Sequence, residues 1–207
     1  MLNSVKEQAN MYNTTDNANL SFYGHVLISD ADTGEVLLDK YNAINFENMA
    51  IAIAGLLGQQ SDGGNGFHIG KMRFGTGGTN IDSNGNITYN TPKTSGTDTT
   101  LYNETVGSAS RFEKLLTPGD FEVSTQTGQT YRDLTSICIL QYNEQELVDA
   151  GQPASDNGAN FEDFVFDELA LVGDNDALLT HLIFHPIQKS QNRKLEIRYT
   201  LRITAGS

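Results

Sequence analysis

Two histidines stand four residues apart in HLIFHP, residues 181–186, which is the spacing of the zinc-binding pair on a metalloprotease helix. That chemistry needs a helix, because residues four apart then share one face, and it needs a glutamate directly after the first histidine. Here Leu182 follows His181, Pro186 follows His185, and the run is rich in strand-forming residues. On a strand the two histidines would share a face but lie roughly 13 Å apart. The pattern therefore predicts no shared metal ion.

Two other patterns could carry chemistry on their residue types alone. GTGGT, residues 75–79, is a glycine-rich loop after a predicted strand, where nucleotide-binding proteins cradle phosphates. It lacks the Lys-Ser/Thr that completes the motif and no helix pattern follows it, which favours a plain turn. The carboxylate pairs Glu162/Asp163 and Asp167/Glu168 could serve hydrolysis, but no surrounding pattern predicts a pocket that would separate their pKa values. We expect no catalytic residue, no cofactor and no enzyme.

A partial calcium motif lies in the polar region that follows. Asp82, Asn84 and Asn86 match the first three ligand positions of a calcium loop. Gly85 comes too early for that motif, and Lys93 takes the place of the bidentate glutamate. The sequence predicts at most a weak surface cation there, and no metal site.

The sequence predicts that these residues are positioned by strands and turns. Gly, Thr, Asn and Ser fill much of a chain with only 19 % charged and 38 % hydrophobic residues. The final strand is the clearest, because apolar residues at 195, 197, 199, 201 and 203 alternate with polar ones. A hairpin is predicted at 26–38, about a turn at 30–34. The other predicted strands are 68–75, 121–125, 131–142, 164–172 and 178–187, and further turns are predicted at 174–176 and 189–192. Residues 101–116 are ambiguous between strand and short helix.

One helix is predicted, from Asn45 to Gly58, with Asn45 as its N-cap. It is apolar nearly all round from Met49 to Leu57, so we expect it to be buried. The fold prediction is a mainly β protein: an antiparallel, jelly-roll-like β-sandwich with one buried helix. Its domains are an extended N-terminal arm, residues 1–20, and a single sandwich, residues 21–207, with a long polar loop at 75–100. The loop is expected to project, with a small hairpin at Asn84-Gly85.

Charge and cysteine content limit the partners. A net charge of −13 disfavours nucleic-acid binding, and no apolar run is long enough for a membrane span. The single cysteine, Cys138, lies in the apolar run ICIL and is expected in the core, without need of an oxidising compartment.

The charges are unevenly distributed. Between Asp133 and Gln188 there are eleven Asp and Glu and no Lys or Arg, and basic residues then dominate to position 202. These are either two solvated faces or complementary surfaces of neighbouring copies. The polar arm is expected to dock on a neighbouring subunit. The interface candidates are Lys6, Tyr12, Lys189, Arg193, Lys194, Arg198, Arg202, Asp163, Asp167 and Glu168.

Two stretches resemble structural proteins of tailed bacteriophages, of the T4-like and marine phage type. GHVLISDADTGEVLLDKYNAINFENMAIAIA, residues 24–54, resembles their opening, and FVFDELALVGDNDALLTHLIFHPIQKSQNRKLEIRYTLRI, residues 164–203, resembles their end. The resemblance implies a non-enzymatic virion component that is made in the host bacterial cytoplasm. Its partners would be other copies of itself, as a homo-oligomer, and other virion proteins.

The resemblance does not fix the position in the virion. The leading hypothesis is a component of the neck, tail, baseplate or fibre-attachment region, and the alternative is a capsid decoration protein. A carbohydrate- or receptor-binding module is a third hypothesis, with Tyr89 and Tyr102 near the polar loop, although the chain has no Trp. A glycan hydrolase that uses the carboxylates at 162–168 ranks below these.

Overall fold

The computed structural model describes residues 19–58, 68–103, 112–124, 128, 130–142, 163–190 and 192–206. The first eighteen residues of the arm, with Lys6 and Tyr12, lie outside the described residues, as does the whole acidic loop at 143–160. The elements are β1 (Asn19–Asp30), β2 (Val36–Ile44), α1 (Phe46–Leu57), β3 (Ile69–Gly75), β4 (Thr79–Ile81), β5 (Ile87–Tyr89), β6 (Phe112–Leu115), a 3-10 turn (Pro118–Asp120), β7 (Phe121–Val123), β8 (Tyr131–Leu140), β9 (Asp163–Gly173), β10 (Thr180–Ser190) and β11 (Leu195–Gly206).

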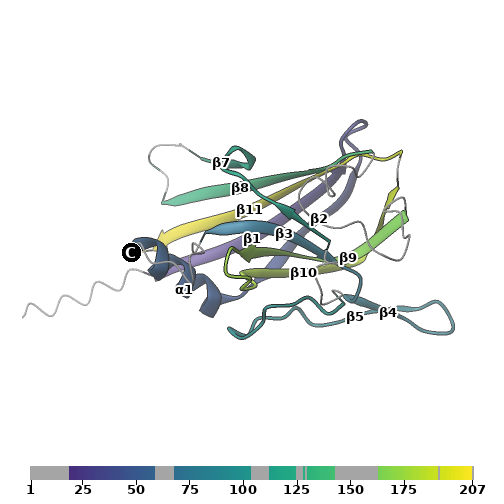
Figure 1. The fold of residues 1–207 in the computed structure, drawn as a ribbon, viewed down its shortest axis with the longest axis horizontal. Helices are drawn as coiled ribbons and strands as arrows, with labels where there is room; N and C mark the ends of the chain where they lie inside the picture. Colours follow the sequence, from purple (N-terminus) through teal and green to yellow (C-terminus); the bar gives the residue numbers. More distant parts are fainter. Residues whose placement is uncertain are drawn as a thin grey trace, which may run out of the picture.

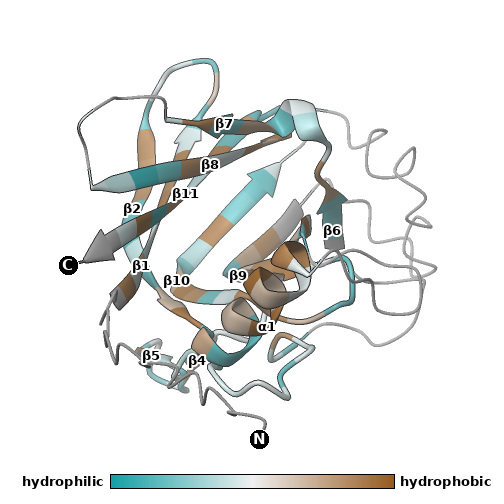
Figure 2. Cartoon of the chain, turned by 90° about the vertical axis from the view of Figure 1, so that its left-hand side faces the viewer, coloured by the Kyte–Doolittle hydropathy of each residue, from teal (hydrophilic) through white to brown (hydrophobic). Residues whose placement is uncertain are grey.

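Nine of these strands form one antiparallel sheet in the order β6-β3-β9-β10-β2-β1-β11-β8-β7, which curls so that its two halves face each other (Figures 1 and 2). The halves meet where β10 pairs with β2 through only two residue pairs, Thr180 with Ile44 and His181 with Ala43. We call β6-β3-β9-β10 the first half and β2-β1-β11-β8-β7 the second half. The predicted mainly β, sandwich-like fold with one helix is confirmed, with a single curled sheet supplying both layers.

The β1–β2 hairpin forms where the sequence predicts it. The Asp30 carboxylate accepts hydrogen bonds from the backbone N–H groups of Asp32 and Thr33, and this fixes the start of the turn. Gly34 adopts a φ of 74°, a left-handed conformation that glycine enters at little cost. The predicted turn at 174–176 also forms, with Asp176 at a φ of 65°.

Helix α1 begins and ends as predicted, but it is not buried all round. Asn45 caps it by accepting a hydrogen bond from the Asn48 backbone N–H at 3.1 Å, and the Gly58 N–H bonds the Ala54 carbonyl. Only one face is buried, whereas Phe46, Ile51, Leu56 and Leu57 are exposed. The expectation of a fully buried helix is therefore corrected. The helix lies at one end of the two sheet halves (Figure 2), so only one face meets the core.

The core fills the space between the two halves of the sheet. The first half contributes Phe74, Phe166 and Phe184, whose rings meet edge to face at 5.3 and 5.6 Å. The second half contributes the inward residues of β1, β8 and β11, including Cys138 as predicted. The alternation of β11 is confirmed, because Leu195, Ile197, Tyr199 and Leu201 are buried and the residues between them are not.

The polar region after β3 is only partly a projection. β4 and β5 form the expected small hairpin, closed by Gly85 at a φ of 83°. Leu101 instead packs in a small cluster with Ala170, Val172 and Leu178, outside the main core. Residues 91–103 thus pack back on the first half near β9. The ambiguous stretch before β7 contains a strand, β6, and β7 pairs with β8 as predicted.

Candidate functional site

His181 and His185 both lie on β10 but in different surroundings. His181 is fully buried, whereas His185 is exposed. Leu182 and Phe184 belong to the main core and Ile183 does not, and this alternation places His181 and His185 on the same, outer face of β10, as expected. The pairing of β10 with β9 becomes irregular between Ile183 and Ile187. Within the described ranges, no group of three or more His, Cys, Asp or Glu side chains is placed to hold a metal ion.

His181 forms a buried hydrogen-bonded pair with Glu168. Its Nε2 lies 3.0 Å from Glu168 Oε2, and its Nδ1 accepts the backbone N–H of Lys93 at 2.8 Å. Because Nδ1 acts as an acceptor, the ring proton sits on Nε2 and is donated to the carboxylate. Both nitrogens of the ring are thus occupied by the fold, which leaves His181 without a free nitrogen for proton transfer to a ligand.

Glu168 is held by backbone donors from two separate segments. One carboxylate oxygen accepts the N–H groups of Gly77 and Asn103, and the other accepts the N–H of Tyr102 besides His181. Burial alone would raise the pKa of Glu168, but the hydrogen bond from His181 and those from the backbone outweigh it and hold the pKa below its ordinary value. Glu168 is therefore a buried anion that ties the two ends of the polar loop to β9.

Asp167, the neighbour of Glu168, holds the same loop. Its carboxylate accepts the backbone N–H groups of Gly78 and Thr79, each at 2.8 Å, and the Thr79 hydroxyl. A Cβ atom at Gly78 would lie 2.6 Å from the Asp167 carbonyl oxygen, so no larger residue fits. The glycine-rich GTGGT loop does cradle anions, and these anions are the chain's own carboxylates. Sequence reasoning missed this link between GTGGT and the Asp-Glu pair, since the two lie about ninety residues apart.

A second buried charge cluster lies beside the first. The fully buried Arg73 guanidinium bonds Glu113 at 2.9 Å, Asp176 at 2.9 Å and the Thr99 carbonyl at 2.8 Å. Lys71 also reaches Asp176 at 2.8 Å. Burial raises the pKa of Asp176, but the bond from Lys71 and the charges of Lys71 and Arg73 bring it below its ordinary value. This cluster joins β3, β6 and the turn after β9, and sequence reasoning did not find it.

The interface candidates divide by exposure. Asp167, Glu168 and Lys189 are buried within the chain, so they are corrected from surface candidates to residues of the fold. Their polar and acidic types gave no sign of burial, which depends on backbone donors far away in the sequence. Asp163 begins β9 with its side chain outside the described part, and Lys194 is partly exposed.

The three arginine candidates are bound by acids of the same chain. Arg193 bonds Asp30 at 3.2 Å, and Arg198 bonds Glu122 at 2.7 Å. Arg202 makes a two-pronged bond with Asp133, with both distances at 2.8 Å. The basic face of β11 is therefore neutralised in large part by its own neighbours, which argues against an open basic surface.

An apolar groove lies at the end of the sandwich beneath α1. It has a volume of about 470 Å³, and Met49, Ala52 and Leu56 of the helix form one wall. Phe22 of β1 and Leu201 and Ile203 of β11 lie on the other side. We call it the helix groove. Most of its lining is carbon, so it suits an apolar side chain.

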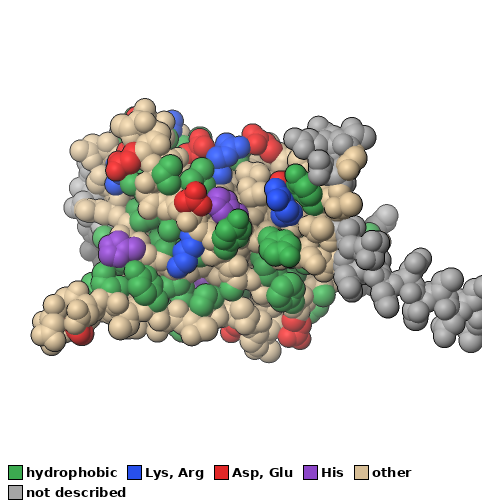
Figure 3. Space-filling model, turned by 180° about the vertical axis from the view of Figure 1, so that it is seen from behind, with side chains coloured by type: hydrophobic (Ala, Val, Ile, Leu, Met, Phe, Trp, Pro, Cys, Tyr) green, Lys and Arg blue, Asp and Glu red, His purple; other side chains and the backbone are tan. Residues whose placement is uncertain are grey.

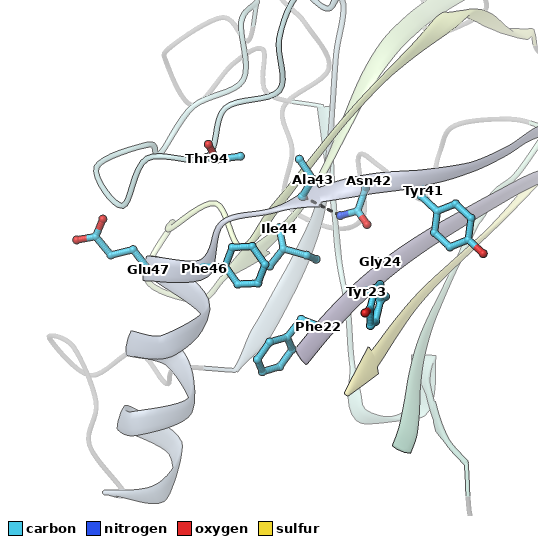
Figure 4. Close-up of a pocket in the computed structure, with 10 residues that line it drawn as sticks. All are labelled: Phe22, Tyr23, Gly24, Tyr41, Asn42, Ala43, Ile44, Phe46, Glu47 and Thr94. Atoms are coloured by element: carbon cyan, nitrogen blue, oxygen red, sulfur yellow. Dashed lines mark hydrogen bonds between the residues drawn. The ribbon is translucent and has the colours of Figure 1, made fainter. Parts of the chain in front are cut away.

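A different groove crosses the outer face of the second half, the face turned to the viewer in Figure 3, where hydrophobic, basic, acidic and histidine side chains intermingle. Two adjoining hollows of about 690 and 550 Å³ share Tyr23 and Tyr41. The first continues toward Phe46 and the start of α1 (Figure 4), and the second toward Arg202. We call the pair the tyrosine groove.

No family model, no curated protein and no solved structure matches this chain. Among the described helices, none is long and apolar enough to cross a membrane.

Proposed function

We propose that the chain is a non-enzymatic structural subunit of a tailed-bacteriophage virion, in the neck, tail, baseplate or fibre-attachment region. One observation that supports the proposal is the position in the fold of the two stretches that resemble phage proteins. Residues 24–54 supply most of β1, all of β2 and most of α1. Residues 164–203 supply most of β9, all of β10 and most of β11. These five strands are consecutive in the sheet, in the order β9-β10-β2-β1-β11. The resemblance therefore covers one continuous structural unit.

The observation that carries the assembly role is the unfilled apolar surface around α1. Leu57 is 82 % exposed and Phe46 is 63 % exposed, while Leu56 lines the helix groove. Exposed apolar side chains grouped on one element mark a surface that another protein covers. The buried carboxylates are used to hold the loop at 75–103, which supports a structural role for them over a catalytic one.

The proposed occupant of the helix groove is the N-terminal arm of a second copy. The described chain starts at Asn19 on β1, and Phe22, three residues later, lines the groove. The residues before Asn19 include Met1, Leu2 and Val5, apolar side chains of the type that the groove lining accepts. Because the arginines of β11 have acidic partners in their own chain, charge complementarity between copies is not part of this proposal.

The assembly half of the proposal is tested by light scattering on the full chain. We expect an oligomer that dissociates when Leu56→Lys places a charge in the groove, or when residues 1–18 are removed. Ile81→Lys is the matched control, because the Ile81 side chain is exposed on β4 and belongs neither to α1 nor to the groove lining. A monomeric full chain, or an oligomer indifferent to Leu56→Lys and to the truncation, contradicts the proposed contact.

The virion half is tested with gold-labelled antibody on purified particles of the phage that encodes the chain. Label on the neck or tail supports the proposal, and label spread over the shell moves the protein to the capsid-decoration alternative. Absence of the chain from purified particles overturns the virion role.

A further inference from the structure

The tyrosine groove is built from outward residues of four neighbouring strands. His25 of β1 stands opposite Tyr41 of β2 and Thr200 of β11 in the strand registers. In the next row, Tyr23 of β1 stands opposite Arg202, which in turn stands opposite Asp133 of β8. The groove floor is thus hydrogen-bonded sheet, which holds these side chains at fixed spacing.

Aromatic rings are exposed along this groove although water is the poorer environment for them. Tyr41 is 73 % exposed and Tyr23 is 57 % exposed, and Phe46 continues the row at the α1 end. Figure 4 shows the Phe46, Tyr23 and Tyr41 rings along the same hollow. Aromatic faces that remain open in a groove can stack on flat apolar surfaces, and the C–H face of a pyranose ring is such a surface.

Fixed hydrogen-bonding groups stand beside those rings. Asp133 and Arg202 hold each other by two bonds of 2.8 Å, and the Arg202 guanidinium also lies 4.1 Å from the centre of the Tyr131 ring. This pair presents acceptors and donors in one rigid plane, as recognition of adjacent hydroxyl groups requires. His25 is likewise fixed, by Asp39 at 2.7 Å and by edge contact with Tyr41.

Charge decides which kind of saccharide fits. The lining includes the carboxylates of Glu47 and Asp133 and the guanidinium of Arg202, so two negative charges face one positive charge. An anionic sugar would meet a net negative site in which the only guanidinium is already neutralised by Asp133. The arrangement therefore favours an uncharged ligand.

We propose that the tyrosine groove binds a neutral oligosaccharide, with Tyr23 and Tyr41 stacking on sugar rings and Asp133 and Arg202 bonding their hydroxyl groups. Phe22 lines both this site and the helix groove, but Tyr23, Tyr41, Asp133 and Arg202 line the tyrosine groove alone. Saccharide binding by these four residues does not require the chain to assemble with itself. The earlier hypothesis placed a glycan contact near Tyr89 and Tyr102. Tyr102 is instead used by the fold, since its hydroxyl bonds the Thr91 carbonyl and its ring lies beneath Lys93.

The test is an array of neutral and anionic oligosaccharides probed with the full chain, followed by titration calorimetry on the best neutral ligand. We expect binding to neutral saccharides alone. Tyr23→Ala and Tyr41→Ala should each weaken the affinity at least tenfold, because each removes one stacking surface. Tyr89→Ala is the matched control, an exposed tyrosine outside the groove, and should change the affinity less than twofold.

Three results would overturn the proposal: no neutral saccharide bound, binding to anionic saccharides only, or binding that survives both groove substitutions. Light scattering on the same variants adds a fourth. If Tyr23→Ala or Tyr41→Ala dissociates an oligomer and no saccharide binds, the face is a protein interface. Failure of the helix-groove experiment would leave the saccharide result unaffected, since Leu56 lines only the helix groove and Tyr23 and Tyr41 line only the tyrosine groove.

Discussion

At the scale of single residues, the buried Glu168 carboxylate holds several parts of the fold together through its hydrogen bonds. Four donors converge on its two oxygens, from His181 and from the backbone of Gly77, Tyr102 and Asn103. Glu168→Gln keeps the shape but replaces one acceptor oxygen with a donor group, which leaves two buried donors unsatisfied. We expect a loss of about 3 kcal/mol in the free energy of unfolding, measured in urea.

Glu47→Gln is the control for this substitution. Glu47 is exposed and accepts one backbone N–H, from Gly96, which the amide oxygen of glutamine can still accept. We expect its effect to stay within about 1 kcal/mol. Equal losses in the two variants would mean that the buried network contributes no more than a surface contact.

The same carboxylates set the response to acid. Glu168 and Asp176 keep a pKa below their ordinary values despite burial, and the bond from Arg202 lowers the pKa of Asp133. A carboxyl with a lowered pKa in the folded state binds fewer protons there than in the unfolded state. Its contribution is complete above the ordinary pKa, which is 4.5 for Glu168, and is lost as the pH falls toward the folded value.

We therefore expect the free energy of unfolding to be nearly constant from about pH 7 to about pH 5 and to fall steadily below that. Urea titrations at stepped pH would show this. Glu168→Gln should reduce the drop, because one of the contributing carboxyls is gone. A drop of unchanged size in that variant would assign the acid sensitivity to the other carboxyls.

At the scale of elements, Asn45 connects α1 to the polar loop. Its Oδ1 caps the helix through the Asn48 N–H, and its Nδ2 donates to the Ser95 carbonyl. Asn45→Ala removes both bonds at a fully buried position, and we expect a loss of about 2 kcal/mol. Asn45→Ser can keep the cap but loses the bond to Ser95, so its loss in urea unfolding should be intermediate. If the Asn45→Ala and Asn45→Ser variants have the same free energy of unfolding, the cap makes no measurable contribution to stability.

The elements differ in how far the sequence predicted them. Local sequence signals were sufficient to predict three features. These are β11, from its alternation, the β1–β2 turn, from Asp30 and Gly34, and the helix cap at Asn45. The exposed face of α1 was not predictable. The apolar sequence of the helix indicates how much apolar surface it could bury, but not which other elements of the fold lie close enough to cover that surface. The single curled sheet was equally invisible, since its closure rests on two residue pairs between β10 and β2.

Of the candidate sites, the sequence indicated individual residues and missed the sets they form. GTGGT and the Asp167-Glu168 pair both stood out, but their contact is a property of the folded chain. The tyrosine groove gave no local signal, because its residues come from β1, β2, β8 and β11 and meet only through strand register. Alternation on β1 and β11 would have placed Tyr23 and Arg202 on outward faces, but not opposite each other.

At the scale of the whole molecule, the question is whether the two halves of the sheet unfold together. Their direct pairing is slight, with two residue pairs, yet a single main cluster of buried side chains includes residues of both halves. Side-chain packing between the layers must therefore supply most of the coupling. Phe166 of β9 is fully buried in that cluster, between Phe74 and Phe184 of its own half.

Phe166→Ala should lower the free energy of unfolding by about 3–5 kcal/mol through the cavity that it leaves. If the halves form one cooperative unit, hydrogen exchange will show the amides of β11 losing as much protection as those of β9, although β11 lies in the other half. Val165→Ala, at a half-exposed neighbour on β9, should cost less than about 1 kcal/mol. Protection of β11 that survives Phe166→Ala would mean that the halves unfold separately. The second half, which carries the tyrosine groove, would then be able to keep its structure without the first.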